Sequence, residues 1–274
     1  MAVSIAEITK LRKMTGAGMI DCKNALAEAN GDLDAAVELI RKRGQAIAAK
    51  REDRDASEGC VLAAANGEYA AIVALKCETD FVATNQDFIS LTQMVLDAAM
   101  TNRPADIEAL KAIMVDGRTI AELIIDRSGI TGEKMELGDF MSLTATSTMS
   151  YIHPGNRLAT IVGFNKGGVE YQVARDVAMQ VAAMNPIAVS RDEFPADLVA
   201  KEFEIAKDKA REEGKPDAML EKIAQGRINK FYQENSLLEQ AFVKESKMTI
   251  KQYLESKEKA LTVISFKRFT LNAD

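Results

Sequence analysis

The sequence has one histidine, three cysteines and no apolar run that approaches the length of a membrane span. A transmembrane helix needs about 20 consecutive apolar residues, so we expect no membrane association. The three scattered cysteines (Cys22, Cys60 and Cys77) are too few for a disulfide scaffold and predict a reducing, cytoplasmic location. Charged residues also interrupt the N-terminus and exclude a signal peptide; these are Glu7, Lys10, Arg12 and Lys13.

Motifs for catalysis, metals and nucleotides are missing as well. A nucleophilic Cys or Ser usually recruits a histidine base, but His153 precedes a Pro-Gly turn, a context typical of an exposed residue. No C-x-x-C, H-x-x-H or E-x-x-H pattern indicates a metal site. The nearest glycine-rich phrase, Gly129 to Lys134, lacks the spacing of a phosphate-binding loop. We therefore predict no enzymatic activity, no cofactor, no metal and no direct nucleotide binding.

Excess positive charge is also lacking, since the 274 residues carry a formal net charge of −6. Binding to nucleic-acid backbones needs a basic face that displaces counterions, so we predict no strong nucleic-acid binding. One local exception is the basic stretch from Arg41 to Arg54, which Glu52, Asp53 and Asp55 dilute. A solvated helix face or linker is the favoured interpretation of this stretch, and an RNA-binding patch is the alternative.

What is present indicates an α+β protein of two or three domains. Residues 1–55 are predicted to form a three-helix domain with a linker. Ser4 and Glu7 fit a capping box for the first helix, and the second helix is expected from about Gly18. Asp32 is suited to cap the third helix, which we predict to end at Gly44, so that residues 45–57 form the linker.

Residues 56–145 and 146–274 are predicted to form two related halves of a core. In the first half, two apolar strands flank a type I′ turn at Asn66-Gly67, and helices follow to about Gly129. In the second half, a hairpin spans Ser147 to Phe164 and a helix follows it. The similarity of residues 69–75 to residues 158–164 suggests an internal repeat of hairpin plus helix.

The rest of the second half is predicted to contain an antiparallel helical hairpin at about residues 195–234. Its two amphipathic segments are joined by Gly214-Lys-Pro216, a sequence suited to a sharp reversal. A short helix at Thr249 to Ser256 and a last strand at Leu261 to Phe269 are expected after it.

One phrase does not fit an ordinary strand ending. Cys77-Glu-Thr79-Asp80-Phe81-Val82-Ala83 places an aromatic residue beside a carboxylate where a turn is expected. Residue chemistry alone favours a helix cap at Thr79 or Asp80 followed by Phe81 as a core anchor. The alternative is an exposed interface residue, because aromatic side chains are frequent anchors of protein interfaces.

Two phrases resemble the signatures of the elongation factor Ts family. One is Leu11-Arg-Lys-Met-Thr-Gly-Ala-Gly-Met-Ile-Asp-Cys-Lys-Asn-Ala-Leu26, and the other is the phrase from Cys77 to Ala83. Residues 150–153, 157–159 and 226–231 are also similar to that family. The resemblance covers roughly residues 4–269.

The resemblance implies a ubiquitin-associated-like three-helix domain, and then a core of two related halves with an inserted helical hairpin. It implies a guanine-nucleotide exchange factor that promotes GDP release from the translational GTPase EF-Tu. By matching position, Thr79, Asp80, Phe81 and Val82 would enter the GTPase and dislodge its Mg²⁺ ion. The residues that would dock on EF-Tu are Arg12, Met19, Ile20, Lys23 and His153.

Two departures from the family pattern and two competing functions accompany this expectation. Better-known members continue into a C-terminal helical module, whereas this sequence reaches Asp274 soon after the last predicted strand. His153-Pro154 also replaces a more typical glycine-rich turn. The competing functions are an RNA- or ribosome-associated docking protein that uses the basic stretch, and a thiol enzyme that uses Cys77.

Overall fold

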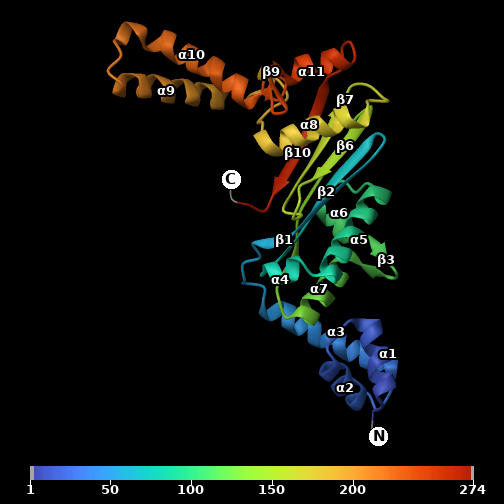
Figure 1. Cartoon of the computed structure of the whole chain (residues 1–274). Coiled ribbons are helices and arrows are strands. Elements are labelled where there is room, and N and C mark those ends of the chain that lie inside the picture. Colours follow the sequence, from blue (N-terminus) through green and yellow to red (C-terminus); the bar gives the residue numbers. More distant parts are fainter. Residues whose placement is uncertain (1–2, 273–274) are drawn as a thin grey trace.

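The computed structural model describes residues 3–272. The first two residues of the predicted domain 1–55 and the last two of the predicted domain 146–274 lie outside the described residues. The molecule is α+β and elongated, as Figure 1 shows. A group of helices lies at the N-terminal end, two small sheets form the middle, and a long helical hairpin projects from the opposite end.

The N-terminal helices are α1 (Ile5–Thr15), α2 (Met19–Glu28) and α3 (Leu33–Lys50). Their starts follow from local sequence, since Ser4 and Glu7 form the predicted capping box and Asp32 accepts hydrogen bonds from the first turn of α3. Buried apolar side chains from all three helices form a small separate core; they include Ile8, Leu11, Cys22, Leu26 and Ala36.

The prediction that the third helix ends at Gly44 is wrong, because α3 continues to Lys50. Gly44 is buried in the helix interior and faces Gly129 of α7 (Ile120–Thr131). Gly44 therefore allows two helices to pack closely and does not terminate α3. Of the predicted linker, residues 45–50 are helical and only the remainder is turn and irregular chain.

The first sheet has the antiparallel order β1-β2-β5, formed by Glu58–Asn66, Tyr69–Cys77 and Met135–Thr144. The β1–β2 hairpin is as predicted, but its turn is displaced by one residue. Asn66 pairs with Tyr69, which leaves Gly67 and Glu68 in the loop. A type I′ turn needs positive φ at both loop residues; only Gly67 has it, with φ of 60°, so the predicted turn type is wrong.

Between β2 and β5 the chain forms α4 (Asp80–Ala83), α5 (Gln86–Asn102) and α6 (Ile107–Lys111). A two-stranded hairpin, β3 (Met114–Val115) with β4 (Arg118–Thr119), then leads into α7. The predicted helical end near Gly129 lies within two residues of the observed one, since α7 continues to Thr131 and Gly132 closes it in the left-handed conformation.

The second sheet has the antiparallel order β10-β7-β6, formed by Val263–Thr270, Leu158–Phe164 and Ser147–Ile152. Helix α8 (Tyr171–Met184) follows β7. After a 3-10 turn at Arg191–Glu193, the chain forms the predicted hairpin of α9 (Ala196–Glu212) and α10 (Asp217–Asn235). The last elements before β10 are β8 (Ala241–Phe242), β9 (Glu245–Thr249) and α11 (Ile250–Lys257).

The two sheets stack face to face and each is covered on its outer face by a helix. An apolar layer between the sheets includes Val61, Ile72 and Leu143 from the first sheet and Ala159 and Ile161 from the second. Helix α5 packs on the outer face of the first sheet, and α8 packs on the outer face of the second. This arrangement leaves the ends of the strands, rather than the sheet faces, available for function.

Candidate functional site

The segment Thr79 to Val82 follows the end of β2, with Thr79 as the N-cap of the short helix α4. The Thr79 hydroxyl caps this helix, with its oxygen accepting from the backbone N–H of Val82 at 3.4 Å. Phe81 is 83% exposed and Asp80 is also exposed. The core-anchor interpretation of Phe81 is therefore wrong. Ala83 is buried and Val82 packs against the first core, so these two residues fix the segment and leave the aromatic ring in solvent.

The second half of the molecule contributes to the neighbourhood of α4. A surface hollow is lined by Thr79 and Asp80 on one side and by Gly155 and Arg157, which follow His153, on the other. An ion pair between Arg157 and Glu58 connects this turn to the start of β1. The structure therefore brings the turn after β6 next to the exposed Asp80, which precedes Phe81.

His153 is exposed in that turn, as its context predicted. Its Nδ1 lies 3.1 Å from the Oη of Tyr151, and the two rings are in edge contact. This partner is at the end of the adjacent strand β6, so the histidine is held at the surface and is not arranged as a base for a nucleophile.

The other predicted docking residues lie on the N-terminal helices. Arg12 is on α1, and Met19, Ile20 and Lys23 are on the first turns of α2. All four side chains are exposed, including the apolar side chain of Ile20 at 74%. Helices α3 and α7 lie between this surface and α4, as Figure 1 shows, so the predicted site residues form separate surface regions and not one cluster.

The cysteines do not provide reactive thiols. All three are buried and free. Burial, together with the nearby Glu133 carboxylate, raises the pKa of Cys77 to about 12, and burial raises the pKa of Cys60 to about 11. The Cys77 Sγ donates to the Thr79 carbonyl oxygen at 3.2 Å. A thiol with such a pKa is protonated at neutral pH and is a poor nucleophile, which removes the basis for a Cys77 enzyme.

Between residues 3 and 272, no group of three or more His, Cys, Asp or Glu side chains is placed to hold a metal ion. No helix in this described part of the chain is both long and apolar enough to span a bilayer.

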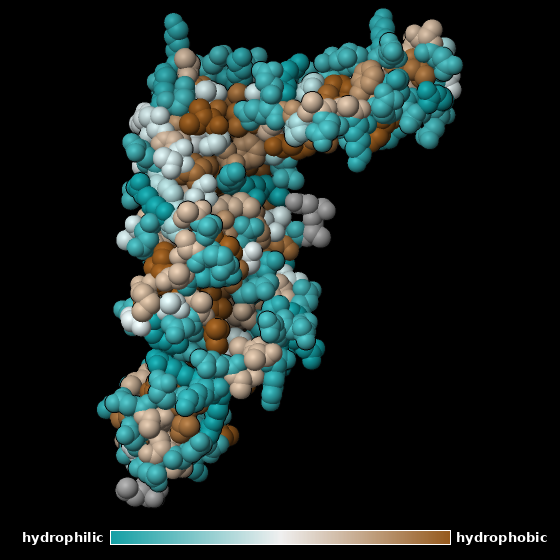
Figure 2. Space-filling model, turned by 180° about the vertical axis from the view of Figure 1, so that it is seen from behind, coloured by the Kyte–Doolittle hydropathy of each residue, from teal (hydrophilic) through white to brown (hydrophobic). Residues whose placement is uncertain are grey.

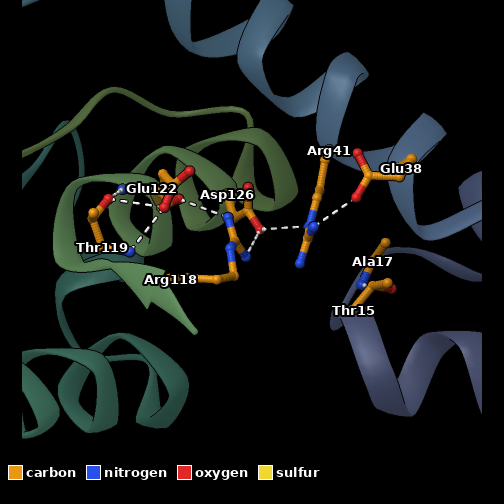
Figure 3. Close-up of polar contacts among 8 residues, drawn as sticks. All are labelled: Thr15, Ala17, Glu38, Arg41, Arg118, Thr119, Glu122 and Asp126. Atoms are coloured by element: carbon orange, nitrogen blue, oxygen red, sulfur yellow. Dashed lines mark hydrogen bonds and ion pairs between the residues drawn. The ribbon is translucent and has the colours of Figure 1, made fainter. Parts of the chain in front are cut away.

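The basic stretch is partly used inside the molecule, at the junction of the N-terminal helices and the first core half. Figure 3 shows Arg41 of α3 between Glu38 and Asp126, with Arg118 on the other side of the Asp126 carboxylate. A cavity of about 400 Å³ lies at the same junction. Sequence reasoning missed this junction, because it interpreted Gly44 and Gly129 as helix ends.

The family model and the similar proteins both indicate one family. The family model described as elongation factor TS matches residues 78–273. Elongation factor Ts of Porphyromonas gingivalis is 59% identical, and that of Azobacteroides pseudotrichonymphae is 54% identical. The Bacteroides thetaiotaomicron elongation factor Ts is 44% identical, and in all three cases the alignment covers all of both chains. The chain therefore belongs to the elongation factor Ts family of translation elongation factors.

Proposed function

We propose that this protein promotes GDP release from the GTPase EF-Tu in the cytoplasm, and that Asp80 and Phe81 on α4 disturb the Mg²⁺ site of that partner. The observation that carries the proposal is the exposure of Phe81, a large apolar side chain that nothing in its own chain covers, at a position where the family signature matches. Family membership supplies the partner.

The physical basis of exchange is thermodynamic linkage. A factor that binds nucleotide-free EF-Tu more tightly than the GDP-bound form weakens GDP binding by the same factor. Mg²⁺ bridges phosphate oxygens and holds the switch elements of a GTPase. A side chain that shifts the metal therefore loosens the nucleotide without contacting its base.

Phe81 alone does not provide enough free energy for efficient exchange. Burying one Phe side chain contributes roughly 1.5–3 kcal/mol, which is about ten- to a hundredfold in affinity. A wider interface has to provide the rest. We assign that contribution to the exposed Arg12, Met19, Ile20 and Lys23 on the N-terminal helices and to His153 in the second half.

This assignment gives each predicted domain a role. Residues 1–55 would form the docking domain, residues 56–145 would carry α4, and residues 146–274 would add the His153 turn. An RNA-docking role has less support, because Arg41, Arg43 and Arg51 of the basic stretch each pair with a carboxylate of the same chain.

The test is the rate of fluorescent GDP release from EF-Tu·GDP with the wild type, Phe81→Ala and the control Tyr171→Ala. Tyr171 is also an exposed aromatic residue, at the start of α8, outside the proposed interface. We expect Phe81→Ala to lower the maximal release rate by about ten- to a hundredfold and Tyr171→Ala to leave it unchanged. Full activity of Phe81→Ala would disprove the role of Phe81, and no acceleration by the wild type would disprove exchange itself.

A further inference from the structure

The start of α4 is held by a reciprocal pair of carboxylates, which we call the carboxylate clamp (Glu78, Thr79, Glu133 and Lys134). Glu133 accepts from both the backbone N–H of Thr79, at 3.1 Å, and the Thr79 hydroxyl, at 2.6 Å. In the opposite direction, Glu78 accepts from the backbone N–H of Lys134 at 2.6 Å. Each of the two segments thus contributes one carboxylate and at least one donor, although they are more than 50 residues apart in the sequence.

Helix α4 has little stability of its own, so its orientation depends on the core contacts of Val82 and Ala83 at its C-terminal end and on this clamp at its start. A helix of only four residues, Asp80–Ala83, is far below the length at which isolated helices form in water. The exposed Phe81 ring makes no buried contact that could orient the segment. Thr79 is the residue that caps α4, so the carboxylate that fixes Thr79 also fixes the direction in which Phe81 points.

Glu133 is in turn fixed to the C-terminal end of α7. The Ser128 hydroxyl of α7 donates to the Glu133 carbonyl oxygen at 2.5 Å, and Gly132 closes the helix with an N–H bond to the Ser128 carbonyl oxygen at 2.8 Å. The Glu133 side chain is therefore presented from a rigid helix end and not from a free loop.

Helix α7 also packs against the N-terminal helices. Its Gly129 packs directly on Gly44 of α3, and its Asp126 pairs with Arg41 of α3. A second connection joins Arg51, just past the end of α3, to Glu78 of the clamp at 3.1 Å. Helix α3 packs with the docking helices α1 and α2, and the residues that follow α3 and α7 contact Glu78 and Thr79, just before Phe81.

We propose that Glu133 is a positioning residue for nucleotide exchange: its carboxylate holds Thr79, and through it Asp80 and Phe81, in a fixed direction relative to α7. The inference rests on the proposed exchange function. Glu133 does not have to touch EF-Tu for this role. It acts through Thr79, so its loss affects how often Phe81 is in the productive direction and not how the N-terminal helices dock.

The experiment compares the wild type with Glu133→Gln, Glu133→Ala and the control Glu108→Gln. The Glu133→Gln change keeps the size of the side chain but leaves only one acceptor oxygen for two donors. Glu108 is an exposed carboxylate on α6, paired with Lys111 and without contact to the clamp, so its change removes the same charge from the same half of the core. Thermal unfolding of each variant establishes that it is folded.

The first readout needs no partner. Amide hydrogen exchange of residues 79–84 is expected to become at least about tenfold faster in Glu133→Ala, since hydrogen bonds to a charged group are lost. Glu133→Gln should give a smaller increase, and Glu108→Gln should give none. Unchanged protection in Glu133→Ala would overturn the positioning role whatever the protein does to EF-Tu.

The second readout is the dependence of GDP release on factor concentration. We expect Glu133→Ala to lower the maximal rate by about tenfold while the half-saturating concentration, which reflects docking, changes by less than about twofold. In the Phe81→Ala background, Glu133→Ala should have a smaller effect than in the wild type, because Asp80 is then the only one of the two proposed side chains left to be positioned. Additive effects, or a loss confined to the half-saturating concentration, would overturn the proposal. A wild type without exchange activity would overturn the proposed function. The hydrogen-exchange result would still show whether Glu133 holds Thr79 in place.

Discussion

Asp176 on α8 is a buried carboxylate, only 6% exposed, in the core of the second half. It accepts hydrogen bonds from Lys244, Gln172 and Tyr253, at 2.7, 2.6 and 3.0 Å. Burial by itself raises the pKa of Asp176, but these donors outweigh burial, and the net pKa lies below the usual value. The charged form is therefore the one that stabilises the fold.

The sign of the pH dependence follows from this lowered pKa. A carboxyl group with a lower pKa in the folded state stabilises the protein above its unfolded pKa, near 3.8, and loses that effect as pH falls through the folded pKa. We expect Asp176→Asn to reduce the free energy of unfolding by about 2 kcal/mol at pH 7, and the difference from the wild type to shrink below pH about 4.

Urea unfolding at pH 7 and pH 3 measures both effects, with Asp53→Asn as the control because Asp53 is exposed. Equal losses of stability for Asp176→Asn at the two pH values would contradict the assigned role of the charge.

Single residues could be predicted from the sequence where their partners are close in the chain. The Ser4–Glu7 capping box and the Thr79 cap depend on residues three positions apart, and both are present. The exposure of Phe81 was not predictable from residue chemistry, because buried Ala83 and half-buried Val82 take the core positions instead. Glu133 could not be found either, since its contact with Thr79 depends on how two distant segments fold together.

At the scale of elements, the crossing of α3 and α7 is determined by two glycines. A Cβ placed on Gly129 would lie closer than 3.0 Å to the Gly44 backbone, a separation that real Cβ atoms do not show. A Cβ placed on Gly44 would lie 3.4 Å from the Gly129 Cα, which is close to ordinary contact. The crossing is therefore more sensitive to substitution on α7 than on α3.

We expect Gly129→Ala to destabilise the protein by about 1–3 kcal/mol, because the two helices have to separate. The control is Gly226→Ala in α10, where no atom lies within 4 Å of the added Cβ. That change should be stabilising by about 0.5–1 kcal/mol, since alanine favours a helix more than glycine does. Thermal unfolding of the two variants gives the comparison, and equal midpoints would contradict the proposed crossing.

The longer helices and the paired strands of both hairpins were predictable because their apolar periods are clear. The elements that were missed are short or half-exposed. Strand β5 has only part of its residues buried, and β8 has two residues, so neither shows a strong period. The length of α3 was misjudged because a glycine in a helical pattern indicates a helix end unless packing on another helix is known.

At the scale of the whole molecule, the two core halves repeat one order of elements. Each has a hairpin, a long helix, a two-stranded hairpin, a further helix and a third strand that pairs with the second. The helices before the third strands, α7 and α11, both begin with a capping box, formed by Thr119 with Glu122 and by Thr249 with Gln252. The repeat is thus longer than the hairpin plus helix predicted from the sequence.

The halves differ in what is inserted between the repeated elements. The connection after β2 contains α4 with Phe81, whereas the connection after β7 contains Gly167 and Gly168 and no helix. The connection after α8 contains the α9–α10 hairpin, whereas that after α5 contains the short α6. The proposed site therefore lies on one of these connections, and similarity of the halves could not reveal which connection carries it.

The hairpin of α9 and α10 projects from the core as an extended arm, and Figure 2 shows apolar side chains along the junction of its two helices. Its buried residues, which include Ala206, Ala210, Leu220, Ala224 and Ile228, lie on the facing sides of the two helices. The arm is joined to the core at its base, where Phe194 packs against Phe231 and Tyr232 and Ala188 bridges to Ser236.

A shortened arm should therefore leave the core intact. We expect replacement of residues 204–226 by a four-residue glycine-rich loop to remove helical circular dichroism signal and to shift the unfolding midpoint of the core by only a few degrees, because the removed apolar surface was buried within the arm. Phe194→Ala keeps the full arm but removes a buried ring at its base, and should cost about 3 kcal/mol. Calorimetry of both variants separates the contribution of the arm itself from that of the packing at its base. A core midpoint that falls further on shortening the arm than on Phe194→Ala would mean that the arm supports the second half along its length.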